Sequence, residues 1–336
     1  MKISIGTNIK DGPWGGGNLF AINLRDYLIT KGHYVVNNLD DDDIDVILLT
    51  EPRRTSESSA FTHIDILRYR DFVKRDVAVV HRINECDERK NTNFVNQYLI
   101  EANKSADATV FVSSWLKELF INQGLICEKI SVIMSGANSK IFSNSEKQTK
   151  QKEKIFKIVT HHWGANWNKG FDIYQKLDQL LESETNKKQF SFTYIGNVPP
   201  KFKFKNTNLI DPLSGKDLAN EIIKNDIYLT ASLNEPSGNH HIEGAQCGLP
   251  ILYIDSGGTT EYCQGFGVMF NPENFEEKLN EIVNDYGKHK KSMVSYPFNS
   301  DVMCENYLSL FISLKEDKDN LIDNRKNQNI IKREKY

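Results

Sequence analysis

The chain has 336 residues, of which 39% are hydrophobic and 26% are charged, and its formal net charge is -3. This length exceeds what one hydrophobic core usually serves, so two domains are expected. No long basic stripe accompanies the slightly acidic balance, which makes nucleic acid a poor candidate partner.

The first half alternates short apolar runs with amphipathic helical stretches. One such stretch carries Phe20, Leu24, Tyr27 and Leu28 on a single helical face and ends at Gly32. The apolar runs predict buried parallel strands at Ile3–Ile5, Val46–Leu49, Val77–Val80, Val110–Val112 and Val132–Met134. Alternation of this kind predicts a doubly wound α/β sheet, here over residues 1–145.

A polar stretch without large apolar residues follows, and it indicates an interdomain linker over residues 146–154. A second alternating set then predicts another α/β domain over 155–297. Its expected strands are Ile155–Val159, Phe190–Ile195, Ile227–Leu229, Ile251–Ile254 and Val268–Phe270. A last amphipathic helix is expected within 298–314, and the charged tail 315–336 is expected to be disordered. Two such halves leave a cleft between them, and ligands bind at the carboxyl ends of such strands.

The five cysteines are odd in number and form no Cys-x-x-Cys pair, which argues against a disulfide scaffold or a structural zinc site. They suit a reducing cytosol. The N-terminus enters a strand at once, and no run approaches the ~20 apolar residues that a membrane helix needs. We therefore expect a cytoplasmic protein, with attachment to the inner face of a membrane left open.

A glycine-rich segment lies between the first expected strand and helix and includes Gly15, Gly16 and Gly17. It lacks the Lys-Ser/Thr of a Walker loop, and its spacing does not fit the dinucleotide fingerprint. A flexible turn that exposes backbone N–H groups at a helix N-terminus suits a diphosphate or a sugar. A plain strand–helix turn is about equally compatible with this segment.

A second cluster carries more information, because Glu235 and Glu243 stand eight positions apart around the start of an expected helix. Ser237 and Gly238 would expose N–H groups there, where the helix dipole stabilises an anion. Glu243, about two turns into the helix, could reach a ribose from the same face. The competing interpretation is a surface helix with a solvated glutamate.

The segment from Glu235 to Pro250, with Glu-Pro-x-Gly and then Cys-Gly-Leu-Pro, resembles the signature of retaining glycosyltransferases of family four. The Gly257-Gly258-x-x-Glu261 turn, the early glycine loop and Lys169-Gly170 agree with that resemblance. It covers roughly residues 1 to 314 and is specific around Glu235 to Glu261. It implies a GT-B fold, in which two Rossmann-like domains face each other across a cleft and a final helix crosses back to the N-terminal domain.

The resemblance also implies roles for individual residues. Glu235 would hold the hydroxyls of the donor sugar, and Glu243 would bind the ribose. Lys169 would bind the diphosphate together with backbone amides at the start of the helix. These amides are those of Ser237, Gly238, Asn239 and His240. His81, which ends the expected strand Val77–Val80, resembles a histidine that the family places near the transferred sugar, although a lone strand-end histidine is more often structural. Nucleotide sugar is thus the implied substrate, and no metal cofactor is expected.

One departure concerns the phosphates. The family usually has an arginine five residues before its lysine, and this sequence has Gly164 there. The second phosphate-binding cation must therefore come from elsewhere, with a histidine or Arg82 as the candidates.

The sequence also bears on other functions. Adjacent histidines at 161–162 and 240–241 do not fit a shared zinc site, since neighbours on a strand point to opposite faces. The sequence contains no Gly-x-Ser-x-Gly elbow, which argues against a serine hydrolase. A nucleotide-sugar epimerase and a non-catalytic sugar-nucleotide or glycan-binding protein remain as alternatives. The sequence leaves open the base, the donor sugar, the acceptor (glycan or lipid-linked) and the oligomeric state.

Overall fold

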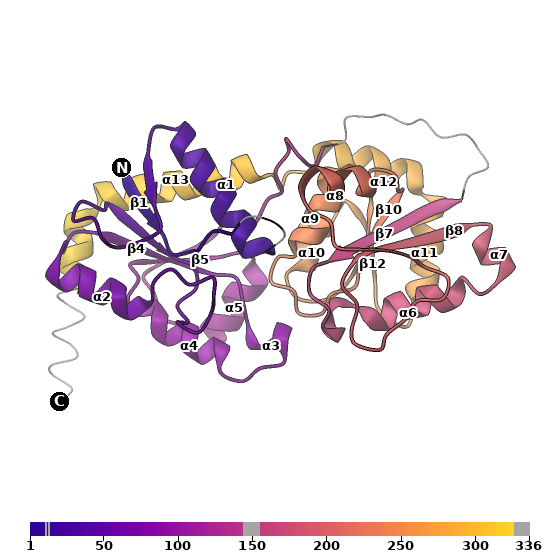
Figure 1. Cartoon of the computed structure of the whole chain (residues 1–336), viewed down its shortest axis with the longest axis horizontal. Coiled ribbons are helices and arrows are strands. Elements are labelled where there is room, and N and C mark those ends of the chain that lie inside the picture. The colour runs from indigo at the N-terminus through magenta and orange to yellow at the C-terminus, as the bar shows by residue number, and fades with distance from the viewer. Residues whose placement is uncertain (11, 13, 144–154, 326–336) are drawn as a thin grey trace.

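The computed structural model describes residues 1–10, 12, 14–143 and 155–325. Two parallel six-stranded sheets lie side by side, each covered by helices on both faces, and together they form two lobes (Figure 1). The predicted class, two Rossmann-like α/β domains facing across a cleft, is confirmed. The linker expected at 146–154 lies outside the described residues.

The N-terminal sheet has the strand order β2-β1-β3-β4-β5-β6. Its strands are β1 (Lys2–Ile5), β2 (Tyr34–Val36), β3 (Val46–Leu49), β4 (Ala78–Ile83), β5 (Ala108–Phe111) and β6 (Lys129–Val132). Every residue of β3, β4 and β5 is buried, which explains why β3 is a continuous apolar run and why β4 and β5 are mostly apolar, with His81, Arg82 and Thr109 as the exceptions. The order reverses between β1 and β3, and ligands bind at such a switch point.

Helices cover both faces of this sheet. They are α1 (Gly16–Thr30), α2 (His63–Phe72), α3 (Asp87–Lys90), α4 (Val95–Asn103) and α5 (Ser114–Asn122). Helix α1 shares one apolar core with the final helix α13 (Ser300–Glu316), whereas α2, α4 and α5 build the cores of the opposite face.

The C-terminal sheet has the order β12-β11-β10-β7-β8-β9, with its switch point between β7 and β10. The strands are β7 (Phe156–His162), β8 (Phe190–Gly196), β9 (Asn208–Ile210), β10 (Ile227–Thr230), β11 (Ile251–Ile254) and β12 (Gly267–Phe270). The helices are the 3-10 turn η1 (Trp167–Lys169), α6 (Phe171–Leu180), α7 (Glu184–Lys187), α8 (Gly215–Ile222), α9 (Asn239–Gln246), α10 (Thr259–Cys263), α11 (Phe275–Asn284), α12 (Tyr286–Ser292) and the 3-10 turn η2 (Met293–Ser295).

Helix α13 leaves the C-terminal lobe and runs along the N-terminal one (Figure 1). Tyr307 and Phe311 are fully buried against the α1 layer, and the ring of Tyr307 packs edge-on against Phe20. Because α13 belongs to the core of the N-terminal lobe, the chain ties the two lobes together twice.

The segment after α13 differs from the expectation of a disordered tail. Residues 318–325 are helical, Leu321 is buried in the α1–α13 core, and Arg325 donates to Asp107 at 2.7 Å. Leu321 and the ion pairs of Lys318 with Asp76 and of Arg325 with Asp107 anchor this stretch, a signal that its charged composition hides. Residues 326–336 lie outside the described part of the chain.

Candidate functional site

The candidate site lies at the switch point of the C-terminal sheet. Lys169 follows strand β7 and Glu235 follows β10, and these strands are neighbours in the sheet. Gly238 has a φ of 71°, and a Cβ there would lie 2.4 Å from the His241 ring. Only glycine allows this close turn into α9.

Glu235 is held between two cations, although it is only 5% exposed. Lys169 Nζ lies 2.7 Å from Glu235 Oε2, and Arg89 Nε lies 3.1 Å from Oε1. Burial by itself would raise the pKa of Glu235, but Arg89 and Lys169 outweigh it and lower that pKa to about 2. The carboxylate is therefore ionised across the physiological range.

Lys169 is buried in the same cluster. Desolvation lowers its pKa, and the charge of Glu235 opposes that effect. This lysine is the cation that the resemblance places beside the diphosphate.

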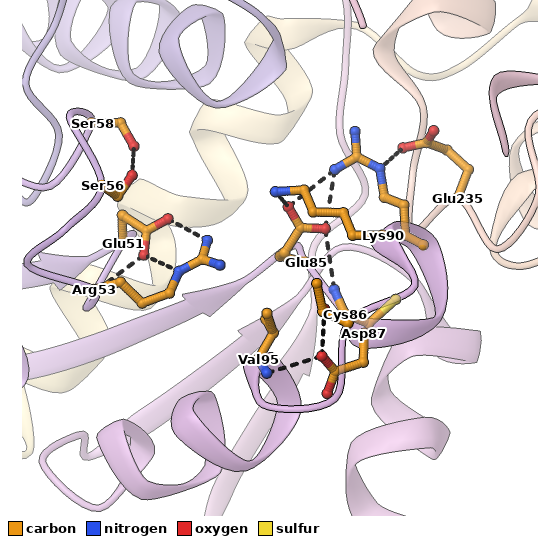
Figure 2. Close-up of polar contacts among 12 residues, drawn as sticks. Glu51, Arg53, Ser56, Ser58, Glu85, Cys86, Asp87, Lys90, Val95 and Glu235 are labelled. Atoms are coloured by element: carbon orange, nitrogen blue, oxygen red, sulfur yellow. Dashed lines mark hydrogen bonds and ion pairs between the residues drawn. The ribbon is translucent and has the colours of Figure 1, made fainter. Parts of the chain in front are cut away.

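Arg89 was missed in the sequence, and it comes from the other lobe. It lies on α3 and also contacts Glu85 at 3.1 Å, while Lys90 contacts Glu85 at 2.5 Å. Figure 2 shows Glu85 and Lys90 on the N-terminal side, opposite Glu235. The neighbouring carboxylates, Glu235 first, raise the pKa of Arg89, which stays charged. Of the two candidates for the second cation, Arg82 lies elsewhere, its guanidinium 3.9 Å from the Phe20 ring.

Glu243 lies on α9 and is also buried, at 5% exposure. His161 Nε2 lies 2.8 Å from Glu243 Oε2, and His161 Nδ1 pairs with the Tyr228 hydroxyl at 2.9 Å. The chain Tyr228–His161–Glu243 fixes the carboxylate that the resemblance assigns to the ribose. His161 thus gains a positioning role that a strand-end histidine pair in the sequence did not indicate.

The other three histidines of the two adjacent pairs, His162, His240 and His241, form a buried cluster beneath this site. The rings of His162 and His240 lie 4.5 Å apart, and those of His240 and His241 lie 4.9 Å apart. Burial lowers the pKa of all three, that of His241 to about 3, so they are neutral at physiological pH. These three histidines therefore supply no positive charge to a phosphate. Within the described residues, no group of three His, Cys, Asp or Glu side chains is arranged to hold a metal ion.

The early glycine loop meets α9 across the lobes. Gly15 is the N-cap of α1, and Gly16 is so near Asn239 that an added Cβ would lie 3.0 Å from its side chain. Gly17 is the second residue of the same helix, and Ser237 and His240 are both buried around the start of α9. The N-termini of α1 and α9 therefore converge, and both carry the positive ends of helix dipoles.

His81 is not part of this cluster. It points to the face of the sheet covered by α2 and α4, where it is completely buried and its Nδ1 lies 2.9 Å from Asn103 Oδ1. Burial lowers its pKa to about 4. The structure therefore does not bring this side chain to Glu235 or Lys169, and its place near the transferred sugar stays a prediction. Strand β4 is buried on both faces, and its apolar run does not reveal which face a given residue takes.

Further contacts close the lobes on each other. The Glu261 carboxylate accepts from the amides of Ser114 and Trp115 at 2.9 and 2.8 Å, at the start of α5. Asn234 Nδ2 donates to the Glu88 carbonyl at 3.2 Å, and Asn168 Nδ2 donates to the Arg89 carbonyl at 3.3 Å.

A small polar cavity of about 50 Å³ lies on the N-terminal side, lined in part by Glu51, Arg53, Arg82 and Glu85.

The fold and this arrangement of the site define a protein with the GT-B architecture of glycosyltransferases. The glycosyltransferase from Rickettsia africae ESF-5 superposes with a TM-score of 0.67 at 14% identity, covering 93% of this chain and 98% of that one. HepE of Anabaena in complex with UDP gives a TM-score of 0.68 at 14% identity, covering 93% and 99%. Both comparisons concern the fold.

A sequence comparison is more specific. The chain is 27% identical over 218 residues to the GPI3 subunit of phosphatidylinositol N-acetylglucosaminyltransferase from Saccharomyces cerevisiae, covering 61% of this chain and 48% of that protein. The chain spans about half the length of the curated relatives it matches. No family model matches it. These relatives are consistent with the resemblance to family four of the glycosyltransferases.

Proposed function

We propose that the protein is a retaining glycosyltransferase that moves a sugar from a nucleoside-diphosphate donor to a hydroxyl of an acceptor. The observation that carries this proposal is the position of the two glutamates. Both are buried at the carboxyl edge of the C-terminal sheet, and Glu235 reaches across to the other lobe. A solvated surface glutamate, the competing interpretation, would not be held in this way.

The proposed reaction breaks the bond between the anomeric carbon and the diphosphate, through a transition state with positive charge on the sugar and negative charge on the leaving group. Lys169 and the converging starts of α1 and α9 stabilise the negative end. Glu235 holds the hydroxyls of the sugar at the positive end, and Glu243 binds the ribose. In the proposed retaining course, the acceptor attacks from the face of the leaving group, whose phosphate oxygen takes the proton. Closed lobes exclude water and limit hydrolysis of the donor.

We also propose that this chemistry needs no metal, because side chains and helix starts meet the charge of the diphosphate. Transfer should then be the same with and without EDTA. The acceptor is proposed to be a glycan or a lipid-linked hydroxyl compound in polysaccharide or glycolipid assembly, in the cytoplasm or at the inner face of a membrane. The yeast relative, named for a phosphatidylinositol acceptor, supports the lipid-linked choice. No helix among the described residues is both long and apolar enough to cross a membrane.

The first test is a thermal-shift screen with UDP, GDP and ADP, followed by transfer from the matching nucleotide sugar. A ligand at about 100 times its Kd should stabilise the folded protein by about 2.7 kcal/mol. Incubation of the donor without an acceptor separates the transferase from an epimerase, which would convert the donor into an isomer.

Glu235→Gln should reduce transfer at least 100-fold, because the neutral amide cannot balance the charge on the sugar. Binding of the nucleoside diphosphate itself should persist, since Lys169 and Arg89 remain. The matched control is Glu184→Gln on α7, whose side chain is 81% exposed. Unchanged turnover in Glu235→Gln, in an assay where the wild type works, would remove the catalytic assignment.

A further inference from the structure

The carboxylate of Glu235 joins one cation from each lobe. Arg89 of the N-terminal lobe faces one oxygen, and Lys169 of the C-terminal lobe faces the other. The backbone around Arg89 is docked as well, through the carbonyls of Glu88 and Arg89 that accept from Asn234 and Asn168. Backbone contacts on both sides of the Arg89 α carbon thus hold this residue, and with it the guanidinium, at the donor site.

Charge in this cluster is not balanced. Three cations, Arg89, Lys90 and Lys169, share the two carboxylates of Glu85 and Glu235. Lys169 and Glu235 are both less than 10% exposed, whereas the Lys90 side chain is 43% exposed, so water compensates part of the excess. A cluster with more cations than carboxylates favours an additional anion.

The loop after β7 offers no second cation of its own. Position 164 is a glycine, and a Cβ added there would lie 3.7 Å from Lys169 Cε and 3.5 Å from Asn166 Nδ2. These are ordinary contact distances, and the backbone at Gly164 is not among those with a positive φ. A side chain at 164 would therefore start beside Lys169 without strain.

We propose that Arg89 and Lys169 form a diphosphate-binding site split between the two lobes, with Glu235 as the anion that holds both cations before the donor arrives. This inference rests on the proposed function. The diphosphate replaces the carboxylate at the two cations, because it offers more negative charge in the same place. Glu235 is thereby released toward the hydroxyls of the donor sugar.

This arrangement couples donor binding to the closed form of the molecule. Lys169 reaches the diphosphate from its own domain, but Arg89 reaches it only when α3 is docked on the C-terminal lobe. The binding energy of Arg89 is therefore available only in the closed state, and a ligand that binds one state better shifts the population toward it.

The test measures affinity by calorimetry for whichever of UDP, GDP and ADP gives the largest thermal shift, and for its parent nucleoside. Arg89→Ala should weaken binding of the nucleoside diphosphate by about 10- to 100-fold, as expected for a lost charge-assisted contact. Binding of the nucleoside should not change, because it carries no phosphate. Arg89→Lys should retain part of the affinity.

A second substitution adds the missing cation from the other lobe. In the double variant Arg89→Ala with Gly164→Arg, affinity for the nucleoside diphosphate should recover by at least tenfold. Lys104→Ala is the matched control, because Lys104 lies outside this cluster, pairs with Glu101 and has a side chain that is 59% exposed. It should bind the nucleoside diphosphate like the wild type.

Two results would overturn the inference while the proposed function stands. In one, Arg89→Ala binds the nucleoside diphosphate as tightly as the wild type. In the other, it loses the nucleoside and the nucleoside diphosphate equally, which would mean that Arg89 acts through the fold. If the wild type binds none of the three nucleoside diphosphates, the proposed function itself fails, and this inference fails with it.

Discussion

His81 and Arg82 are neighbours on β4, and their side chains enter opposite layers of the molecule. Side chains alternate along a strand, so His81 meets Asn103 beneath the sheet while Arg82 lies over Phe20 of α1. Neither side chain pairs with Glu235. The place of a residue in a strand motif therefore does not reveal which layer its side chain occupies.

We expect His81→Ala to act on stability and not on chemistry. Loss of the buried ring and of its hydrogen bond to Asn103 should lower the free energy of unfolding by about 1–3 kcal/mol. Urea unfolding would show this change, and kcat/KM of the folded protein should stay within about twofold of the wild type. A tenfold loss of kcat at unchanged stability would show that His81 takes part in the reaction.

The sequence located the residues of the site that share one loop or one motif. Short local patterns contain Glu235, Glu243 and Lys169, and in the structure Lys169 forms an ion pair with Glu235. Arg89 lies in a polar segment without periodicity, and only the packing of the two lobes brings it to Glu235. Local patterns do not contain that information, because the partner is supplied by tertiary structure.

At the scale of elements, helix α9 depends on a close approach to the sheet. Gly244 faces the ring of Tyr228 on β10, and an added Cβ would lie 2.1 Å from that ring. The same tyrosine bonds His161, which in turn holds Glu243. A shift of α9 away from the sheet would therefore also move the proposed ribose-binding carboxylate.

Gly244→Ala should destabilise the protein by about 1–3 kcal/mol through overpacking, and it should weaken nucleotide binding as well. The comparison variant is Gly287→Ala on α12, where a Cβ would meet nothing within 4 Å. That exchange should be neutral or stabilise by up to about 1 kcal/mol, because alanine favours helix. Thermal unfolding with and without the nucleoside diphosphate distinguishes the two. Equal behaviour of both variants would contradict the packing argument.

The strands that the sequence did not predict are short and lie at sheet edges. Strands β2 and β9 have three residues each and are partly exposed, so neither forms an apolar run. Strand β6 was expected at Val132–Met134 and ends at Val132 instead. The apolar parts of the central strands were predicted, because burial on both faces favours apolar residues. Strands β4 and β7 extend beyond their predicted ends, through His81-Arg82 and His161-His162, because these polar residues are buried as well.

At the scale of the whole molecule, charged and polar contacts close the two lobes at the site. Arg89 pairs with Glu235, and Glu261 accepts from two amides at the start of α5. Such contacts exchange partners readily when a charged ligand enters, whereas a broad apolar interface would not. The closed form should therefore respond to anything that changes the charge of these carboxylates.

A fall in pH is such a change, and the direction of its effect on stability follows from the pKa of Glu235. The pKa of this carboxyl in the folded protein is about 2, below its ordinary value of 4.5. Its contribution to stability is therefore complete above about pH 4.5 and is lost as the pH falls toward 2. At about 1.4 kcal/mol per pKa unit, the loss amounts to about 3 kcal/mol at most.

A comparison of the wild type with Glu235→Gln isolates this contribution, since every other carboxylate titrates in both proteins. The difference between their free energies of unfolding, measured in urea at pH 7 and then in steps down to pH 3, should shrink steadily below pH 4.5. It should shrink less when Arg89→Ala is present in both proteins, because Lys169 is then the remaining cation beside the carboxylate. Parallel curves for the wild type and Glu235→Gln would mean that the ion pairs across the lobes contribute no net stability, and closure would then have to rest on the remaining contacts.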